Sequence, residues 1–220
     1  MPDEFSDKVV LITGAGRGHG HALAEAFAAR GACVAVNDIS PVNLDPLAAQ
    51  HNGRIKAYVD DVAKKVGAQT VVKQAEDDFG RIDILINHAA VEPRVGLLDM
   101  DEWDWHRVLD VNLTGAFLMM QSVGRVMREK GSGVIINLVM ASPSEAQKEG
   151  AYLASMHGLL ALTRSAEEEL SPFGIRVHAV GAGLEKYQNS DANVPSSFVE
   201  AVLYLSHNAS LNGQIVNVEA

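Results

Sequence analysis

Short apolar runs alternate along this chain with longer stretches in which apolar residues recur every three or four positions. The run at 9–12 is followed by a stretch at 18–30 that carries Ala22, Leu23, Ala26 and Phe27 on one helical face. The predicted strands are 9–12, 33–37, 55–59, 82–86, 134–138, 175–180 and 215–218. The predicted helices are 18–30, 63–79, 102–130, 151–170 and 196–206, with a weaker helical pattern at 41–52.

This alternation predicts a single α/β domain that spans residues 1–220. Strands that alternate with helices indicate βαβ units and a parallel sheet. The strands read as continuous apolar runs, which is typical of strands buried on both faces. We therefore expect a doubly wound parallel sheet of about seven strands with helices on both faces. The segment 184–194 is polar and has no period.

The first predicted strand leads into Thr13-Gly14-Ala15-Gly16-Arg17-Gly18-His19-Gly20, which opens the helix at 18–30. Glycines let the backbone approach a diphosphate, and the helix N-terminus supplies N–H groups and a positive dipole end. Asp38 ends the next strand and lies 18 residues after Gly20. This context predicts a Rossmann-type turn that binds a dinucleotide.

Asp38 bears on which dinucleotide is preferred. A carboxylate at this place accepts hydrogen bonds from the adenine ribose and repels a 2′-phosphate. Arg17 argues in the other direction, because a guanidinium can pair with that phosphate. We expect NAD(H) to be favoured over NADP(H).

Further motifs follow in order: Asp61-Val62, Asn87-His88-Ala89-Ala90, Asn112-Leu113-Thr114-Gly115, Tyr152, and a strand that ends in Gly181-Ala182-Gly183. With these motifs the chain resembles the short-chain dehydrogenase/reductase family over nearly its whole length. The glycine turn and the resemblance together assign to the cofactor Thr13, Gly14, Gly16, Arg17, Gly18, His19, Gly20, Asp38, Asp61, Val62, Asn87, Ala89, Ala90, Tyr152 and Gly183.

The resemblance also implies a catalytic tetrad of Asn, Ser, Tyr and Lys, and only half of it is present. Asn112 and Tyr152 match, but the serine position is Met140 and the lysine position is Met156. In the family the tyrosine exchanges a proton with the substrate oxygen, and the lysine favours its ionised form. Methionine offers neither a charge nor a donor, and its sulfur is at best a weak acceptor.

Several residues are candidates to replace the missing groups. Ser142 lies two residues beyond Met140, and Lys148 precedes Tyr152 by four residues. Tyr187 stands near the place of a threonine that contacts the nicotinamide in the family. His19 replaces an apolar residue beside the cofactor, so it either touches the nicotinamide or packs in the core.

The substrate side of the family pattern is shortened. Only the 11 residues 184–194 separate Gly183 from Pro195, where the family has a longer helical segment over the substrate. A segment this short closes a deep pocket poorly, so we expect water to be excluded less well than in the family.

Charge narrows the choice of partners. The chain has 18 basic and 28 acidic residues and a net charge of −10, which argues against nucleic acid and anionic membranes. The N-terminal MPDEFSDK is too polar for a signal peptide, and no apolar run is long enough to span a bilayer. We expect a cytoplasmic protein. No group of His, Cys, Asp and Glu has the spacing of a metal site.

Apolar residues surround much of the middle of the 102–130 helix, and Leu159, Leu160 and Leu162 lie on the next helix. A helix with a single buried face shows only one apolar stripe. The extra apolar surface, together with the resemblance, predicts a homodimer or homotetramer.

Two functions from different classes remain open. The first is an oxidoreductase that transfers a hydride between NAD(H) and the carbonyl or alcohol group of a small molecule, with Tyr152 as acid or base. The second is a non-catalytic NAD(H)-binding protein that acts as a sensor, scaffold or partner subunit. The fold analogy favours the first, while the substituted site favours the second.

Overall fold

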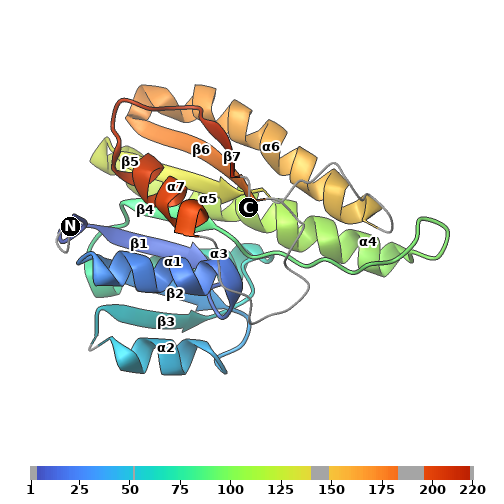
Figure 1. Cartoon of the computed structure of the whole chain (residues 1–220), viewed down its shortest axis with the longest axis horizontal. Helices are drawn as coiled ribbons and strands as arrows, with labels where there is room; N and C mark the ends of the chain where they lie inside the picture. The colour runs from blue at the N-terminus through green and yellow to red at the C-terminus, as the bar shows by residue number, and fades with distance from the viewer. Residues whose placement is uncertain (1–3, 52, 140–148, 183–195, 219–220) are drawn as a thin grey trace.

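The computed structural model describes residues 4–51, 53–139, 149–182 and 196–218. Within them, seven strands form one sheet in the order β3-β2-β1-β4-β5-β6-β7, and every neighbouring pair is parallel (Figure 1). The strands are β1 (Val9–Thr13), β2 (Cys33–Asp38), β3 (Ile55–Val59), β4 (Ile84–Asn87), β5 (Gly133–Leu138), β6 (Ile175–Ala182) and β7 (Ile215–Val218). The predicted doubly wound sheet is confirmed, and its order reverses beside β1.

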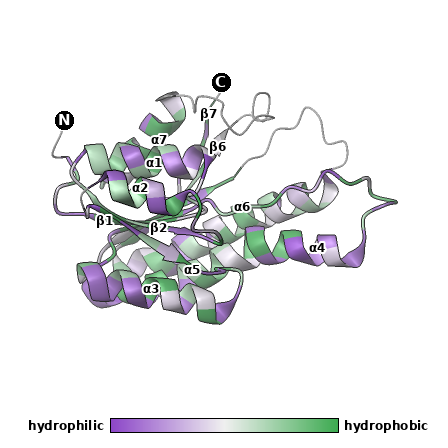
Figure 2. Ribbon diagram, turned by 90° about the horizontal axis from the view of Figure 1, so that it is seen from below, coloured by the Kyte–Doolittle hydropathy of each residue, from purple (hydrophilic) through white to green (hydrophobic). Residues whose placement is uncertain are grey.

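Helices cover both faces of this sheet (Figure 2). Helices α1 (Gly18–Ala29), α2 (Leu44–Gln50) and α7 (Ser196–His207) lie on one side. Helices α3 (Lys65–Phe79), α5 (Ala116–Lys130) and α6 (Gly150–Leu170) lie on the other. Helix α4 (Glu102–Leu109) precedes α5, and a short 3₁₀ turn (Ser171–Phe173) follows α6.

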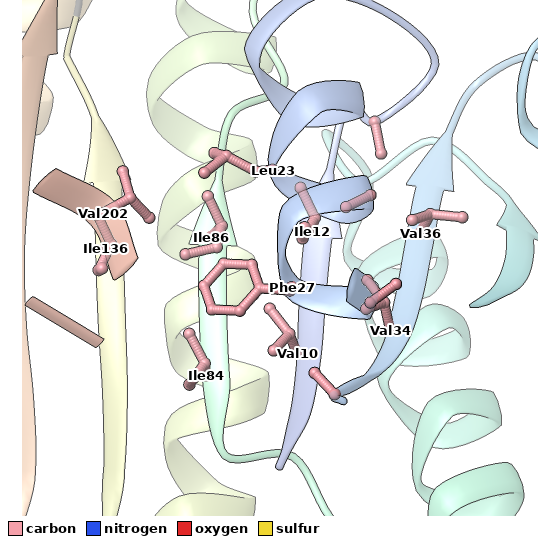
Figure 3. Close-up of a cluster of buried hydrophobic side chains, with 14 of the residues drawn as sticks. Val10, Ile12, Leu23, Phe27, Val34, Val36, Ile84, Ile86, Ile136 and Val202 are labelled. Atoms are coloured by element: carbon pink, nitrogen blue, oxygen red, sulfur yellow. The ribbon is translucent and has the colours of Figure 1, made fainter. Parts of the chain in front are cut away.

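The core has two layers because successive strand residues point to opposite faces. Val10 and Ile12 of β1 pack against α1, around Phe27 (Figure 3). Leu11 packs on the other face, on the side of α3 and α5. All four side chains are fully buried. Burial on both faces explains why the strands read as unbroken apolar runs.

Most predicted elements match with ends shifted by up to three residues, and two of the differences lie near the site. The strand predicted at 82–86 is Ile84–Asn87 in the structure, and Asp83 just before it accepts a hydrogen bond from the backbone N–H of Val9 at 2.9 Å. The helix predicted at 102–130 is not one α-helix. A π-helical turn, Asp110–Gly115, separates α4 from α5.

Candidate functional site

The glycine turn between β1 and α1 lies directly against the end of β4. A Cβ atom on Gly14 would be 2.7 Å from the Cα of Ala89, and one on Gly20 would be 2.6 Å from Nδ1 of His88. Gly18 differs, because its φ is +58° and, apart from its own helix and its chain neighbours, no atom of the described residues lies within 4 Å of the corresponding position. Gly14 and Gly20 thus allow close packing of the turn, whereas Gly18 leaves open space at the start of α1.

Thr13 and His88 join this turn to β4. The Thr13 hydroxyl accepts hydrogen bonds from the backbone N–H groups of His88 (3.1 Å) and Ala89 (3.2 Å). Nδ1 of His88 lies 2.9 Å from the carbonyl oxygen of Gly14 and must donate, because a carbonyl only accepts. Burial lowers the pKa of His88, although these backbone hydrogen bonds oppose the shift. A neutral His88 therefore holds the turn in place.

His19 takes a packing position in the described structure. Its ring centroid lies 4.2 Å from that of Phe198 in α7 and 6.1 Å from that of His88. Burial, reinforced by His88, lowers the pKa of His19 to about 4. The ring is therefore neutral at pH 7 and packs against α7, and its contact with the nicotinamide stays a prediction.

A cleft of about 630 Å³ opens at the carboxyl ends of the strands around β1. Its lining includes eight residues predicted from the sequence: Gly14, Gly16, Arg17, Asp38, Asp61, Val62, Ala89 and Ala90. Asp38 accepts hydrogen bonds from the backbone N–H groups of Gly16 (3.0 Å) and Ser40 (3.3 Å). A Cβ on Gly16 would be 2.8 Å from the Asp38 carboxylate, so only glycine allows this approach. The acidic residue is thus fixed beside the turn.

The first turn of α1 suits an anion. Its N-cap residue, Arg17, has extended backbone angles, and its side chain caps none of the N–H groups of the helix. Uncapped N–H groups and the helix dipole together favour a phosphate. The open space beside Gly18 adds room for close approach. The adenosine diphosphate half of a dinucleotide therefore fits the residues present.

The π-helical turn places Asn112, which is fully buried. Its Oδ1 accepts from the backbone N–H of Val91 (2.8 Å), and its Nδ2 donates to the Val91 carbonyl (3.0 Å) and to Oγ of Ser155 (3.0 Å). Ser155 in turn donates to the carbonyl oxygen of Tyr152 (2.7 Å). Asn112 therefore ties the segment after β4 to the helix that carries Tyr152. π-Turns often occur at functional sites.

The lysine position is filled by a buried thioether. Met156 is 1% exposed and lines a small cavity of about 10 Å³ together with Thr13, Asn87 and Asn112. Asn87 donates to Oδ1 of Asn137 (2.8 Å), but its own Oδ1 is buried and has no hydrogen-bond partner among the described residues. An acceptor thus stands beside this cavity, and Met156 has no donor to offer it.

Tyr152 lies near carboxylates. It is 4% exposed, and burial followed by the charges of Glu92 and Glu149 raises its pKa well above the ordinary value. Arg94 bridges these two acids, with Nε 3.1 Å from Glu92 and Nη2 3.6 Å from Glu149. Among the described residues, the charged groups that shift the pKa of Tyr152 are therefore negative, whereas the lysine of the family is positive. Tyr152 keeps its proton at neutral pH.

The predicted residues do not all meet in one cavity. Thr13, Asn87, Asn112 and Met156 surround the small cavity, whereas Gly18, His19, Gly20 and Tyr152 line neither of these two cavities in the described part of the chain. Met140, Ser142, Lys148, Gly183, Tyr187 and the segment 184–194 lie outside the described residues.

Sequence reasoning missed several residues of this region. Ser155 could have been found from the sequence, because it lies three residues after Tyr152 and so on the same face of the same helix. Glu149 and Arg94 belong to segments far apart in the chain, so only the fold brings them together. Trp103, His106 and Arg107 of α4 also line the large cleft.

Two negative findings concern the described residues only. No helix among them is both long and apolar enough to cross a bilayer. No three or more of their His, Cys, Asp and Glu side chains are grouped so that they could hold a metal ion.

Comparison with known proteins identifies the family. The model for short chain dehydrogenases matches residues 8–197. An uncharacterized oxidoreductase of Thermotoga maritima is 38% identical over 201 residues, which cover 88% of this chain and 78% of that protein. An NAD-dependent glycerol dehydrogenase of Listeria innocua serovar 6a is 36% identical over 177 residues, 80% of this chain and 70% of that protein.

Solved structures support the same family. The crystal structure of a short chain dehydrogenase from Mycobacterium smegmatis has a TM-score of 0.87 and 29% sequence identity, and the match covers 100% of this chain and 94% of that one. The chain therefore belongs to the short-chain dehydrogenase/reductase family, whose members are oxidoreductases that bind a nicotinamide cofactor and act on alcohol or carbonyl groups.

Proposed function

We propose that this protein binds NAD(H) in the cleft beside β1 and slowly reduces a carbonyl group of a small molecule. The observation that carries the proposal is the cleft of about 630 Å³, where Asp38 is held against the glycine turn by its hydrogen bond from Gly16. A related NAD-dependent glycerol dehydrogenase supports both the cofactor and an alcohol or carbonyl substrate. The cytoplasmic location stays a prediction.

The proposed direction follows from Tyr152. When bound, the nicotinamide supplies a hydride for reduction or accepts one for oxidation. Oxidation of an alcohol needs a base, and an unperturbed tyrosine is only about 0.1% ionised at pH 7. The pKa of Tyr152 is raised further by burial and by Glu92 and Glu149, so its phenolate is rarer still. Reduction needs an acid, and Tyr152 already holds the proton.

The choice of cofactor is tested by calorimetric titration with NAD and NADP. We expect the wild type to bind NAD at least about tenfold more tightly, a difference of about 1.4 kcal/mol. Asp38→Asn should narrow that gap, because it removes the negative charge but keeps an oxygen for the N–H of Gly16. Equal or inverted wild-type affinities would show that Arg17 outweighs Asp38. Asp77→Ala, on the exposed face of α3, should leave the ratio unchanged.

A non-catalytic role is the second candidate, and one observation favours it. Met156 is buried where the family has a lysine that steadies the nicotinamide ribose and the tyrosinate. Such a protein would bind the dinucleotide and turn nothing over. NADH consumption with a broad panel of carbonyl compounds distinguishes the two functions, since any turnover above that of a Tyr152→Phe variant supports the enzyme.

We also propose a homodimer or homotetramer that assembles through α5 and α6. A groove between these helices is lined by apolar residues together with Gln121, Arg125, Arg128 and Glu169, and its Phe117 and Phe173 are each 42% exposed. Phe117→Glu should therefore convert the assembly into a monomer in sedimentation experiments, because it puts a charge into an apolar contact. Val66→Glu is the matched control, since Val66 is exposed on α3. A wild-type monomer at micromolar concentration would contradict the proposal.

A further inference from the structure

The outer wall of the large cleft is formed by helix α4. Trp103, His106, Arg107 and Asp110 line the same cavity as Gly14 and Asp38. His106 and Arg107 lie three and four residues after Trp103, on the same face of α4, and Asp110 begins the π-helical turn that follows the helix. This face of α4 therefore lines the cleft.

Trp103 is the large hydrophobic residue of this wall, and it is 65% exposed. The guanidinium of Arg107 lies over the indole ring, 5.2 Å from the ring centroid. A cation–π contact of this kind restricts the side chain. The cleft thus presents an aromatic surface that Arg107 orients and that stays largely exposed among the described residues.

The same wall is tied to the Asp61-Val62 side of the cleft. Nζ of Lys64, the residue before α3, lies 4.0 Å from the Asp110 carboxylate. Lys64 and Asp110 both line the cavity, together with Asp61 and Val62. The α4 wall and the Asp61-Val62 wall therefore enclose one space, and its size of about 630 Å³ leaves room for a planar base.

We propose that Trp103, oriented by Arg107, contacts the adenosine portion of the bound dinucleotide directly. Purine rings stack on aromatic side chains and on guanidinium planes, and every base offers a π-face for this contact. The phosphates at the glycine turn and the ribose at Asp38 orient the molecule so that its adenosine end points toward α4. This inference rests on the proposed binding of NAD(H).

The two tryptophans of the chain make a direct test possible, because both lie on α4 and only Trp103 lines the cleft among the described residues. ADP-ribose, which carries the adenosine diphosphate half alone, is added to Trp105→Phe and to Trp103→Phe. We expect it to quench the fluorescence of Trp103 in the first variant and to leave Trp105 unchanged in the second. Nicotinamide mononucleotide, which has no adenine, should quench neither variant.

Affinity gives the second readout. Trp103→Ala should weaken ADP-ribose binding by about tenfold in calorimetry, within the range that base–aromatic stacking contributes. Trp105→Ala, on the same helix but off the cleft, should bind like the wild type. Normal ADP-ribose binding with no response at Trp103 would overturn this inference and leave the proposed cofactor site intact. No ADP-ribose binding to the wild type would overturn the cofactor site and this inference with it.

Discussion

The double variant Met140→Ser/Met156→Lys is expected to reduce carbonyl compounds at least about a hundredfold faster than the wild type. Loss of a donor to the developing oxyanion costs about 10²–10³ in rate at comparable sites. Residues of one catalytic unit are not additive, so each single change should recover much less than the pair. Consumption of NADH with a broad carbonyl panel measures the effect, and calorimetry shows that NADH binding changes far less.

The structure explains why a lysine at position 156 can be accommodated. Met156 lines the small cavity beside Asn87, whose buried Oδ1 has no hydrogen-bond partner among the described residues. An ammonium can donate to that oxygen, which offsets part of the cost of burying a charge. Its positive charge should also lower the pKa of Tyr152, and each unit of decrease raises the phenolate fraction about tenfold. Alcohol oxidation should therefore gain more than reduction.

Met156→Leu is the matched control for this variant. It keeps an apolar side chain of similar volume, so it should leave both the fold and the turnover close to those of the wild type. A double variant that binds NADH but stays inactive on the whole panel would contradict this explanation. The shortened segment 184–194 would then be the obstacle to catalysis.

The sheet could be predicted because burial on both faces leaves a clear trace in the sequence. Val10 and Ile12 pack on one face and Leu11 on the other, so β1 reads as an unbroken apolar run. The glycine turn was equally visible, since Gly14 and Gly16 each occupy a position where a Cβ would clash. These features are local in sequence, and a local pattern is sufficient to indicate them.

The features that were missed depend on packing between distant segments. The π-helical turn keeps the same apolar spacing as an α-helix, and it becomes recognisable only when Asn112 is seen bonded to Val91 and Ser155. The carboxylates near Tyr152 come from the segment after β4 and from the start of α6. No pattern in either segment indicates that they meet.

Gly18→Ala and Gly20→Ala are expected to fail in different ways, although both glycines lie in the same turn. A Cβ on Gly20 would be 2.6 Å from Nδ1 of His88 and 2.8 Å from the carbonyl oxygen of Gly14. Because a backbone atom must then move, we expect the free energy of unfolding to fall by about 3 kcal/mol, the upper part of the range for overpacking. Denaturant unfolding measures this loss.

Gly18→Ala should instead cost mainly affinity. Its φ of +58° is a strained angle for alanine, which lowers the free energy of unfolding by about 1 kcal/mol. Outside the helix itself, however, no atom of the described residues lies within 4 Å of the new Cβ. That open space is where we place the diphosphate, so ADP-ribose binding should weaken at least about tenfold. Gly80→Ala is the matched control, since Gly80 has a φ of +74° and equally open surroundings, and it follows α3 away from the cleft. It should lose similar stability and no affinity. If Gly18→Ala and Gly80→Ala bind ADP-ribose equally well, the diphosphate does not approach the start of α1.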